Sequence, residues 1–214
     1  MRLVLPRLYV ILDAALLTVP EIECAQKVVN AGVRMLQYRN KSASSRELFE
    51  SARRLASVSV PRGVTFLVND RADVASLSGA DGVHLGQEDL GVEEARQVMG
   101  SGKLVGVSTH NLEQFERAAA TSADYMAVGP VFSTSTKTNP DPVVGIEFIR
   151  RVRSLTDKPI VAIGGITLDR AAEVIKAGAD SVAVVSDILL APDPGKRARQ
   201  FTDLLEAANH AAIL

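Results

Sequence analysis

The chain of 214 residues contains no tryptophan, a single cysteine and only 4% aromatic residues. One cysteine cannot form a disulfide within the chain, which agrees with a reducing compartment, and Cys24 lies at helical spacing among apolar residues, as a buried structural thiol does. No stretch approaches the ~18 uncharged apolar residues that a membrane span requires. The N-terminal apolar run is interrupted by Pro6, Arg7 and Asp13 and does not resemble a signal peptide. We therefore expect a cytoplasmic protein without a membrane partner.

The chain also lacks an excess of charge of either sign, because 24 Lys and Arg side chains are balanced by 25 Asp and Glu side chains and the formal net charge is -1. Since no Lys- or Arg-rich block is present, the sequence predicts no nucleic-acid partner, and any anion must be bound locally. An apolar content of 47%, with 15 glycines and 9 prolines, is ordinary for a folded protein and argues against a disordered chain.

Eight short apolar runs rich in β-branched residues alternate with longer amphipathic stretches along the whole chain. The runs are apolar at successive positions, as strands of a parallel sheet covered on both faces are. We therefore predict an α/β fold, a single (β/α)8 TIM barrel formed by one domain over residues 1–214, with a doubly wound open sheet as the alternative. The predicted strands are Leu8–Leu12, Met35–Tyr38, Thr65–Val68, Gly82–Leu85, Leu104–Val107, Tyr125–Val128, Ile160–Ile163 and Val182–Val185.

A weak internal repeat supports the prediction of eight βα units. Four similar strings each follow a predicted helix and lead into an even-numbered strand, and they recur at a spacing of two βα units. Their small residues let the chain turn closely beneath the ends of the strands. The strings are Ala31-Gly32-Val33, Gly79-Ala80-Asp81, Ser122-Ala123-Asp124 and Gly178-Ala179-Asp180.

Polar residues that directly follow the strands are the first candidates for function, because the loops after the strands form the working face of such a barrel. Gly164-Gly165 after the seventh run and Val185-Ser186 after the eighth occupy places where barrels commonly bind a phosphate through free backbone N–H groups. Glycine lets a ligand approach the backbone, and the hydroxyl of Ser186 adds a donor. The alternative is a tight turn that needs glycine for its φ angles.

Acidic and basic residues after neighbouring strands predict a metal site beside an anion site. Asp70 and Asp89 follow the third and fourth runs, and two oxygen ligands with open positions suit Mg2+, which keeps waters and phosphate oxygens among its ligands. Arg39, Lys41 and Lys137 could converge on the same anion. Taken singly, each aspartate is better explained as a helix cap or loop residue, and taken together they favour a diphosphate.

The segment 129–145 is long for a connection between a strand and a helix, so we interpret it as a binding loop or lid, with a flexible linker as the alternative. His84 lies within a predicted strand and is interpreted as a packed, hydrogen-bonded residue. The sequence has no histidine cluster with zinc spacing, no nucleophile elbow and no GxGxxG motif, which argues against acyl transfer and nicotinamide chemistry.

Seven strings together resemble the thiamine phosphate synthase family of (β/α)8 enzymes over essentially the whole chain. Each string alone is weak, and all seven in order are highly specific. They are QYRNK at 37–41, VND at 68–70, DGVHLGQED at 81–89, VGVSTHN at 105–111, GPVFSTSTK at 129–137, AIGGIT at 162–167 and GADSVAVVSDI at 178–188.

The resemblance implies a transferase of thiamine biosynthesis that joins 4-amino-5-hydroxymethyl-2-methylpyrimidine diphosphate to 4-methyl-5-(2-hydroxyethyl)thiazole phosphate, or to its carboxylated form. The products are thiamine phosphate and pyrophosphate. The implied mechanism is dissociative, with pyrophosphate leaving before the thiazole nitrogen attacks, and it is assisted by Mg2+. The sequence agrees, since it offers positive charge for a leaving group and no obvious activated nucleophile.

The resemblance also implies roles for particular residues at matching positions. Asp70 and Asp89 would hold Mg2+. The thiazole phosphate would be bound by Thr134, Ser135, Thr136, Gly165, Val185 and Ser186. The catalytic set would be Arg39, Lys41, Ser108 and Lys137. The pyrimidine diphosphate would be bound by Gln37, Tyr38, Arg39, Asn40, Lys41, Asn69, Ser108 and Lys137, with Asn40 replacing an acidic residue of many relatives.

Two other functions stay open at this point. One is a thiazole tautomerase of the same superfamily, whose members carry His in the stretch where this chain has Pro130, a residue that cannot transfer a proton. The other is a sensor that binds thiamine precursors without turnover. The expected partners are phosphorylated small molecules, and the sequence leaves the oligomeric state open, a homo-oligomer included.

Overall fold

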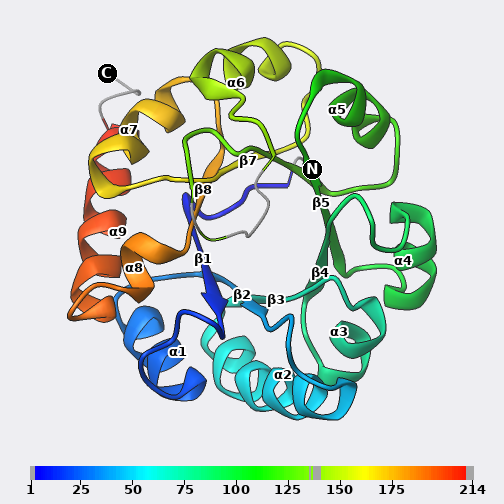
Figure 1. Cartoon of the computed structure of the whole chain (residues 1–214), viewed down its shortest axis with the longest axis vertical. Helices are drawn as coiled ribbons and strands as arrows, with labels where there is room; N and C mark the ends of the chain where they lie inside the picture. The colour runs from blue at the N-terminus through cyan, green and yellow to red at the C-terminus, as the bar shows by residue number, and fades with distance from the viewer. Residues whose placement is uncertain (1–2, 135, 137–140, 211–214) are drawn as a thin grey trace.

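Eight parallel strands form a closed barrel in a computed structural model that describes residues 3–134, 136 and 141–210 (Figure 1). The strands follow one another around the barrel in chain order, and β1 closes the ring by pairing with β8. The predicted barrel is confirmed, and the open sheet is not formed. The strands are β1 (Leu8–Asp13), β2 (Met35–Arg39), β3 (Thr65–Asn69), β4 (Gly82–Leu85), β5 (Leu104–Thr109), β6 (Tyr125–Val128), β7 (Ile160–Ile163) and β8 (Ser181–Val184).

Helices surround the barrel and cover the outer face of the sheet (Figure 1). Ser44 and Asn111 cap two of them, because each side chain accepts a hydrogen bond from a backbone N–H of the first helical turn. Helix α3 has only seven residues, too few for its apolar periodicity to show in the sequence. The helical segments are α1 (Glu21–Asn30), α2 (Ser45–Ser59), the 3-10 turn η1 (Val60–Arg62), α3 (Ala72–Ser78), α4 (Val92–Met99), α5 (Leu112–Ala119), α6 (Gly145–Arg153), α7 (Leu168–Lys176), α8 (Ser186–Leu189) and α9 (Pro194–His210).

Alternation along each strand separates the barrel interior from the layer between strands and helices. In β2, Gln37 is level with Ile11 of β1 and Tyr38 is level with Leu12. Leu12 and Tyr38 belong to the large apolar core of the outer layer, whereas Ile11 belongs to a smaller interior cluster. The interior cluster consists of Leu5, Tyr9, Ile11, Met35, Leu67, Tyr125, Ala127, Val161 and Ala183.

The internal repeat closes the end of the barrel where the strands begin. Asp81, Asp124 and Asp180 occupy the same place in three repeats, just before an even-numbered strand. Their carboxylates accept hydrogen bonds from the backbone N–H groups of Phe66 at 2.9 Å, Val105 at 2.7 Å and Ile160 at 2.8 Å. Each aspartate therefore ties the start of an even strand to the start of the odd strand before it.

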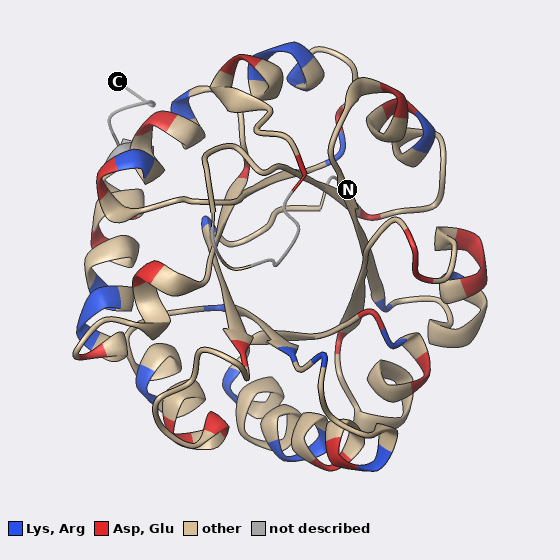
Figure 2. Cartoon of the chain, viewed as in Figure 1, with Lys and Arg blue, Asp and Glu red and all other residues tan. Residues whose placement is uncertain are grey.

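Charges of both signs lie on the outer helices (Figure 2). Over the described residues, no helix is both long enough and apolar enough to cross a membrane. Cys24 is buried, and burial raises the pKa of its thiol to about 11, so the prediction of a structural thiol is supported.

Candidate functional site

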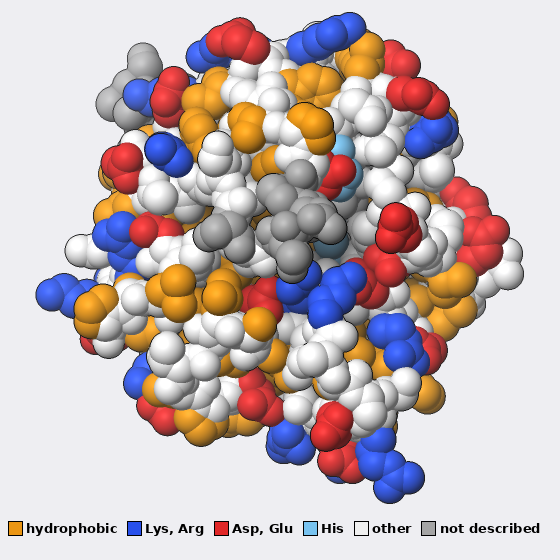
Figure 3. Space-filling model, viewed as in Figure 1, with side chains coloured by type: hydrophobic (Ala, Val, Ile, Leu, Met, Phe, Trp, Pro, Cys, Tyr) orange, Lys and Arg blue, Asp and Glu red, His pale blue; other side chains and the backbone are white. Residues whose placement is uncertain are grey.

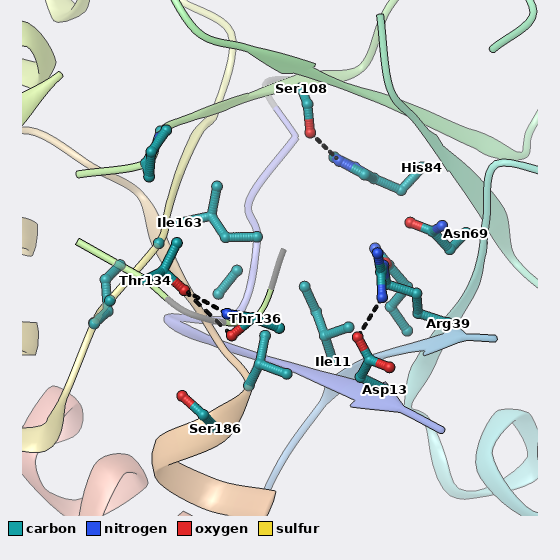
Figure 4. Close-up of a pocket in the computed structure, with 18 of the residues that line it drawn as sticks. Ile11, Asp13, Arg39, Asn69, His84, Ser108, Thr134, Thr136, Ile163 and Ser186 are labelled. Atoms are coloured by element: carbon teal, nitrogen blue, oxygen red, sulfur yellow. Dashed lines mark hydrogen bonds and ion pairs between the residues drawn. The ribbon is translucent and has the colours of Figure 1, made fainter. Parts of the chain in front are cut away.

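A cavity opens at the carboxyl ends of the strands, at the end of the barrel opposite the repeat (Figure 4). It combines apolar walls with polar side chains that come from strands far apart in the chain. At the surface, blue basic and red acidic side chains gather near the centre of this view, with histidine recessed beside them (Figure 3). The lining residues are Ile11, Asp13, Gln37, Arg39, Asn69, His84, Ser108, His110, Gly129, Pro130, Thr134, Thr136, Asp141, Ile163, Gly164, Gly165, Ile166, Ala183, Val185 and Ser186.

Arg39, predicted to bind the diphosphate, lines the cavity and forms an ion pair with Asp13 (Figure 4). The Asp13 side chain is only 3% exposed, and its other oxygen accepts a hydrogen bond from the backbone N–H of Ala15 at 3.1 Å. The strand β1 places Asp13 level with Arg39 of β2. Asp13 was not predicted as a site residue, although a charge that ends the apolar run LYVIL is a usable signal. The pair holds the guanidinium at the cavity wall.

Gln37, Asn69 and Ser108 also line the cavity, as the predicted pyrimidine diphosphate site requires. Ser108 is held from two sides: its hydroxyl lies 2.9 Å from Nε2 of His84, and its carbonyl oxygen accepts a hydrogen bond from Gln87 at 2.6 Å. His84 is buried and hydrogen-bonded, as predicted, and it also lines the cavity (Figure 4).

Three described residues of the predicted pyrimidine diphosphate set do not line the cavity, and one of them, Lys41, is exposed and pairs with Asp70. Tyr38 and Asn40 line a separate surface groove between β2, α1 and α2, because alternate residues of a strand point to opposite faces. The Asn40 amide donates to the Tyr38 hydroxyl at 3.2 Å, and its oxygen accepts from the backbone N–H groups of Ser42 and Ala43. Asn40 thus stabilises the turn after β2.

The two predicted metal ligands, Asp70 and Asp89, come together beside the cavity. The pKa of Asp70 is raised, mainly by burial and also by contact with the Asp89 carboxyl group. The Lys41 ammonium group, which forms an ion pair with Asp70, acts in the opposite direction. Asp70 has a φ of +64°, a conformation that non-glycine residues seldom adopt outside functional sites and turns. Asp89 is oriented by the Gly86 N–H, which donates to it at 2.6 Å. Two adjacent carboxylates, of which the buried Asp70 is costly to ionise, suit a divalent cation.

The described part of the predicted thiazole phosphate site lies on one side of the cavity (Figure 4). Thr134, Thr136, Gly165, Val185 and Ser186 all line it, and the Thr136 N–H and hydroxyl are within hydrogen-bond distance of the Thr134 hydroxyl. The polar groups of this side include the Ser186 side chain at the start of α8.

Gly164 and Gly165 both have positive φ, so the alternative of a turn that needs glycine is supported. A Cβ on Gly164 would also lie 2.5 Å from Cβ of Pro130, so the loop after β7 packs directly against the loop after β6. The Asp187 carboxylate of α8 forms an ion pair with Arg197. The residue of α8 that lines the cavity is the neutral Ser186.

Ser135 and Lys137 lie outside the described residues, so the predicted roles of these two residues stay predictions. Two lining residues near that segment were not predicted as site residues. His110 lies 2.6 Å through Nδ1 from the Gly129 carbonyl oxygen, and its Nε2 lies 3.4 Å from Asp141. His110 follows β5 directly, which is the signal that marks it.

The closed barrel and the cavity with its polar side chains define a (β/α)8-barrel enzyme with its site at the strand ends. Residues 8–188 match the family model described as thiamine monophosphate synthase. The chain is 50% identical to thiamine-phosphate synthase of Koribacter versatilis, over 95% of this chain and 97% of the relative. It is 42% identical to that of Chloroflexus aurantiacus, over 97% of this chain and 96% of the relative.

A solved structure, thiamine phosphate pyrophosphorylase from Pyrococcus furiosus, superposes with a TM-score of 0.86 at 35% identity, covering 94% of this chain and 96% of that one. The chain therefore belongs to the thiamine monophosphate synthase family, and it is a transferase of thiamine biosynthesis. The family resemblance seen in the sequence motifs is confirmed.

Proposed function

We propose that the chain condenses 4-amino-5-hydroxymethyl-2-methylpyrimidine diphosphate with 4-methyl-5-(2-hydroxyethyl)thiazole phosphate, or its carboxylated form, to give thiamine phosphate and pyrophosphate. One observation carries this proposal: two predicted sets of binding residues lie on different sides of a single cavity (Figure 4). Arg39, Asn69 and Ser108 are on one side, and Thr134 and Ser186 are on the other. Two phosphorylated substrates bound there would lie next to each other, as a condensation needs.

The proposed chemistry is dissociative. The bond between the pyrimidine methylene carbon and the diphosphate oxygen breaks, and its electron pair leaves with pyrophosphate. The thiazole nitrogen then forms a bond to the methylene carbon. Arg39, which Asp13 holds in place, and Lys41 would stabilise the negative charge that grows on the leaving group. The reaction needs no protein nucleophile, and the buried Cys24 is not placed to supply one.

The residues present fit a Mg2+ ion. Asp70 and Asp89 would hold it as a pair of carboxylate ligands. Over the described residues, no group of three or more His, Cys, Asp or Glu side chains is placed to hold a metal ion. Two carboxylates leave positions for water and for diphosphate oxygens, as Mg2+ prefers. When bound, the ion would supply positive charge to the diphosphate. The protein's own part is to keep both carboxylates together and to place Lys41 beside them.

The proposal is tested by incubating purified protein with both substrates and Mg2+ and measuring thiamine phosphate by chromatography. We expect product in amounts that depend on both substrates. Tight binding of both substrates without any product would contradict the proposal and favour the sensor. Isomerisation of the thiazole substrate alone would favour the tautomerase.

The map of the two substrates is tested with Ser186→Ala. We expect this change to raise KM for the thiazole phosphate roughly 10- to 100-fold more than KM for the pyrimidine diphosphate, because a hydrogen bond to a charged group is worth roughly 1.5–3 kcal/mol. Ser154→Ala is the matched control, since the Ser154 hydroxyl donates to the Arg151 carbonyl oxygen at the exposed end of α6. An equal effect of Ser186→Ala on both KM values would contradict the map.

A further inference from the structure

A chain of hydrogen bonds crosses the inside of the barrel beneath the cavity. Gln37 Nε2 lies 2.5 Å from the Tyr9 hydroxyl, which lies 3.3 Å from the Tyr125 hydroxyl. The Tyr125 hydroxyl lies 2.9 Å from Nδ1 of His84, and Nε2 of His84 lies 2.9 Å from the Ser108 hydroxyl. Gln37 on β2 and Ser108 on β5 are the two ends of this hydrogen-bond series, and both line the cavity. The three residues between them have no role in the proposed chemistry.

Packing holds these three rings in place. Tyr9 and Tyr125 are fully buried and meet edge to face at 6.3 Å, and the His84 ring stacks on Tyr125 at 5.6 Å. Gly106 of β5 makes room for Tyr125, because a Cβ at that position would lie 2.0 Å from Cζ of the ring. The hydrogen bonds therefore join side chains that have little freedom to change partners.

The order of donors and acceptors follows from the chemistry of the groups. The amide nitrogen of Gln37 can only donate, so the Tyr9 hydroxyl accepts from it. Among the described residues the Tyr125 hydroxyl is the remaining partner of the buried Tyr9 hydroxyl, so we assign the Tyr9 hydrogen to the bond with Tyr125. Tyr125 then donates to Nδ1 of His84. A neutral ring whose Nδ1 accepts carries its hydrogen on Nε2, and that hydrogen points to the Ser108 oxygen.

We propose that Tyr9, Tyr125 and His84 are positioning residues. The two tyrosines hold His84 as its neutral Nε2–H tautomer, and the Nε2–H then donates to the Ser108 oxygen, which leaves the Ser108 hydroxyl hydrogen for the substrate. Ser108, already receiving a hydrogen bond from His84, donates its own to an oxygen of the pyrimidine diphosphate. The identity of that ligand rests on the proposed function, whereas the tautomer does not. Burial raises the pKa of both tyrosines, so their hydroxyl groups keep the hydrogens that this series of hydrogen bonds requires.

The tautomer is tested without substrate by nitrogen-15 NMR on protein labelled at its three histidines. His110→Asn and His210→Asn assign the remaining signals to His84. We expect the wild type at pH 7.5 to show a protonated Nε2 and an unprotonated Nδ1, and Tyr125→Phe to shift both signals toward a mixture of tautomers. Tyr38→Phe is the matched control, because its hydroxyl meets Asn40 outside the barrel and should leave the His84 signals unchanged. A protonated Nδ1 in the wild type would overturn the proposal.

The link to Ser108 is tested by a double-mutant cycle on kcat/KM. We expect Ser108→Ala to lower kcat/KM roughly 10- to 100-fold, the value of one hydrogen bond to a charged group, and Tyr125→Phe to lower it less. If Tyr125 acts through Ser108, Tyr125→Phe has no further effect in a Ser108→Ala background. Losses that multiply would overturn the proposal. A wild type that makes no product would refute the proposed function and leave the NMR result standing.

Discussion

Asp124→Ala is expected to destabilise the barrel at the end opposite the site. The Asp124 carboxylate accepts a hydrogen bond from the N–H of Val105, a fully buried residue, at 2.7 Å, and it forms an ion pair with Arg96. Leaving a buried N–H without a partner costs about 1–3 kcal/mol. The ion pair adds at most about 1 kcal/mol, because both side chains are 22–30% exposed and Arg96 keeps its bonds to the Lys103 and Ser122 carbonyl oxygens.

The expected loss of about 2–3 kcal/mol corresponds to a fall in Tm of roughly 5–10 °C for a chain of this length. Asp124→Asn separates the two contributions, since its amide oxygen can still accept from Val105, and we expect it to cost about 1 kcal/mol or less. Asp81→Ala is the matched control: it removes the corresponding bond to Phe66, and the described residues give Asp81 no ion-pair partner.

Thermal unfolding followed by circular dichroism and urea titration measure these changes. Turnover at 25 °C should stay near the wild-type value for Asp124→Ala, because Asp124 precedes β6 and the cavity follows it. If Asp124→Asn is as damaging as Asp124→Ala, or if Asp124→Ala unfolds within about 0.5 kcal/mol of the wild type, the role assigned to the hydrogen-bond acceptor is wrong.

Two further predictions concern the site. Asp13→Asn leaves Arg39 facing a neutral amide, so we expect kcat/KM to fall roughly 10-fold or more, and unchanged kinetics would show that Arg39 needs no partner. The pKa of Asp70 is raised in the folded state, so ionising it costs folding free energy. This cost grows as the pH rises from the ordinary pKa of the carboxyl group to the raised pKa, and it is fully present above the raised pKa. Asp70→Asn should therefore raise Tm in metal-free buffer at pH 8, lose this advantage at pH 3 and weaken Mg2+ binding. An equal effect on Tm at both pH values would contradict the assignment.

The strands were predictable because each is buried on both faces and reads as a continuous apolar run. The predicted run 182–185 begins and ends one residue later than β8, since Ser181 is small enough to be fully buried and Val185 caps α8. Helix α3 is harder to recognise in the sequence than the longer helices, because its seven residues make too few turns to reveal an apolar face. The regular geometry of the barrel compensates for such local ambiguity, because eight βα units in chain order close into one ring.

The candidate site was predictable only in part. Family resemblance marks five consecutive residues at 37–41, yet alternation within β2 sends Gln37 and Arg39 to the cavity and Tyr38 away from it. Asp13 was missed because its partner is 26 residues away in the chain. The pairing that gives Asp13 its role exists only once β1 and β2 are in register.

The sequence by itself determined the order of strands and helices, the glycine turns and the family, because these depend on local patterning and on short motifs. Only the tertiary structure decided which polar side chains share the cavity and which hydrogen bonds join them. Tyr9, His84 and Tyr125 look like ordinary strand residues in the sequence. They touch because closure of the barrel places β1, β4 and β6 around one interior, where a buried hydroxyl or imidazole must find a partner.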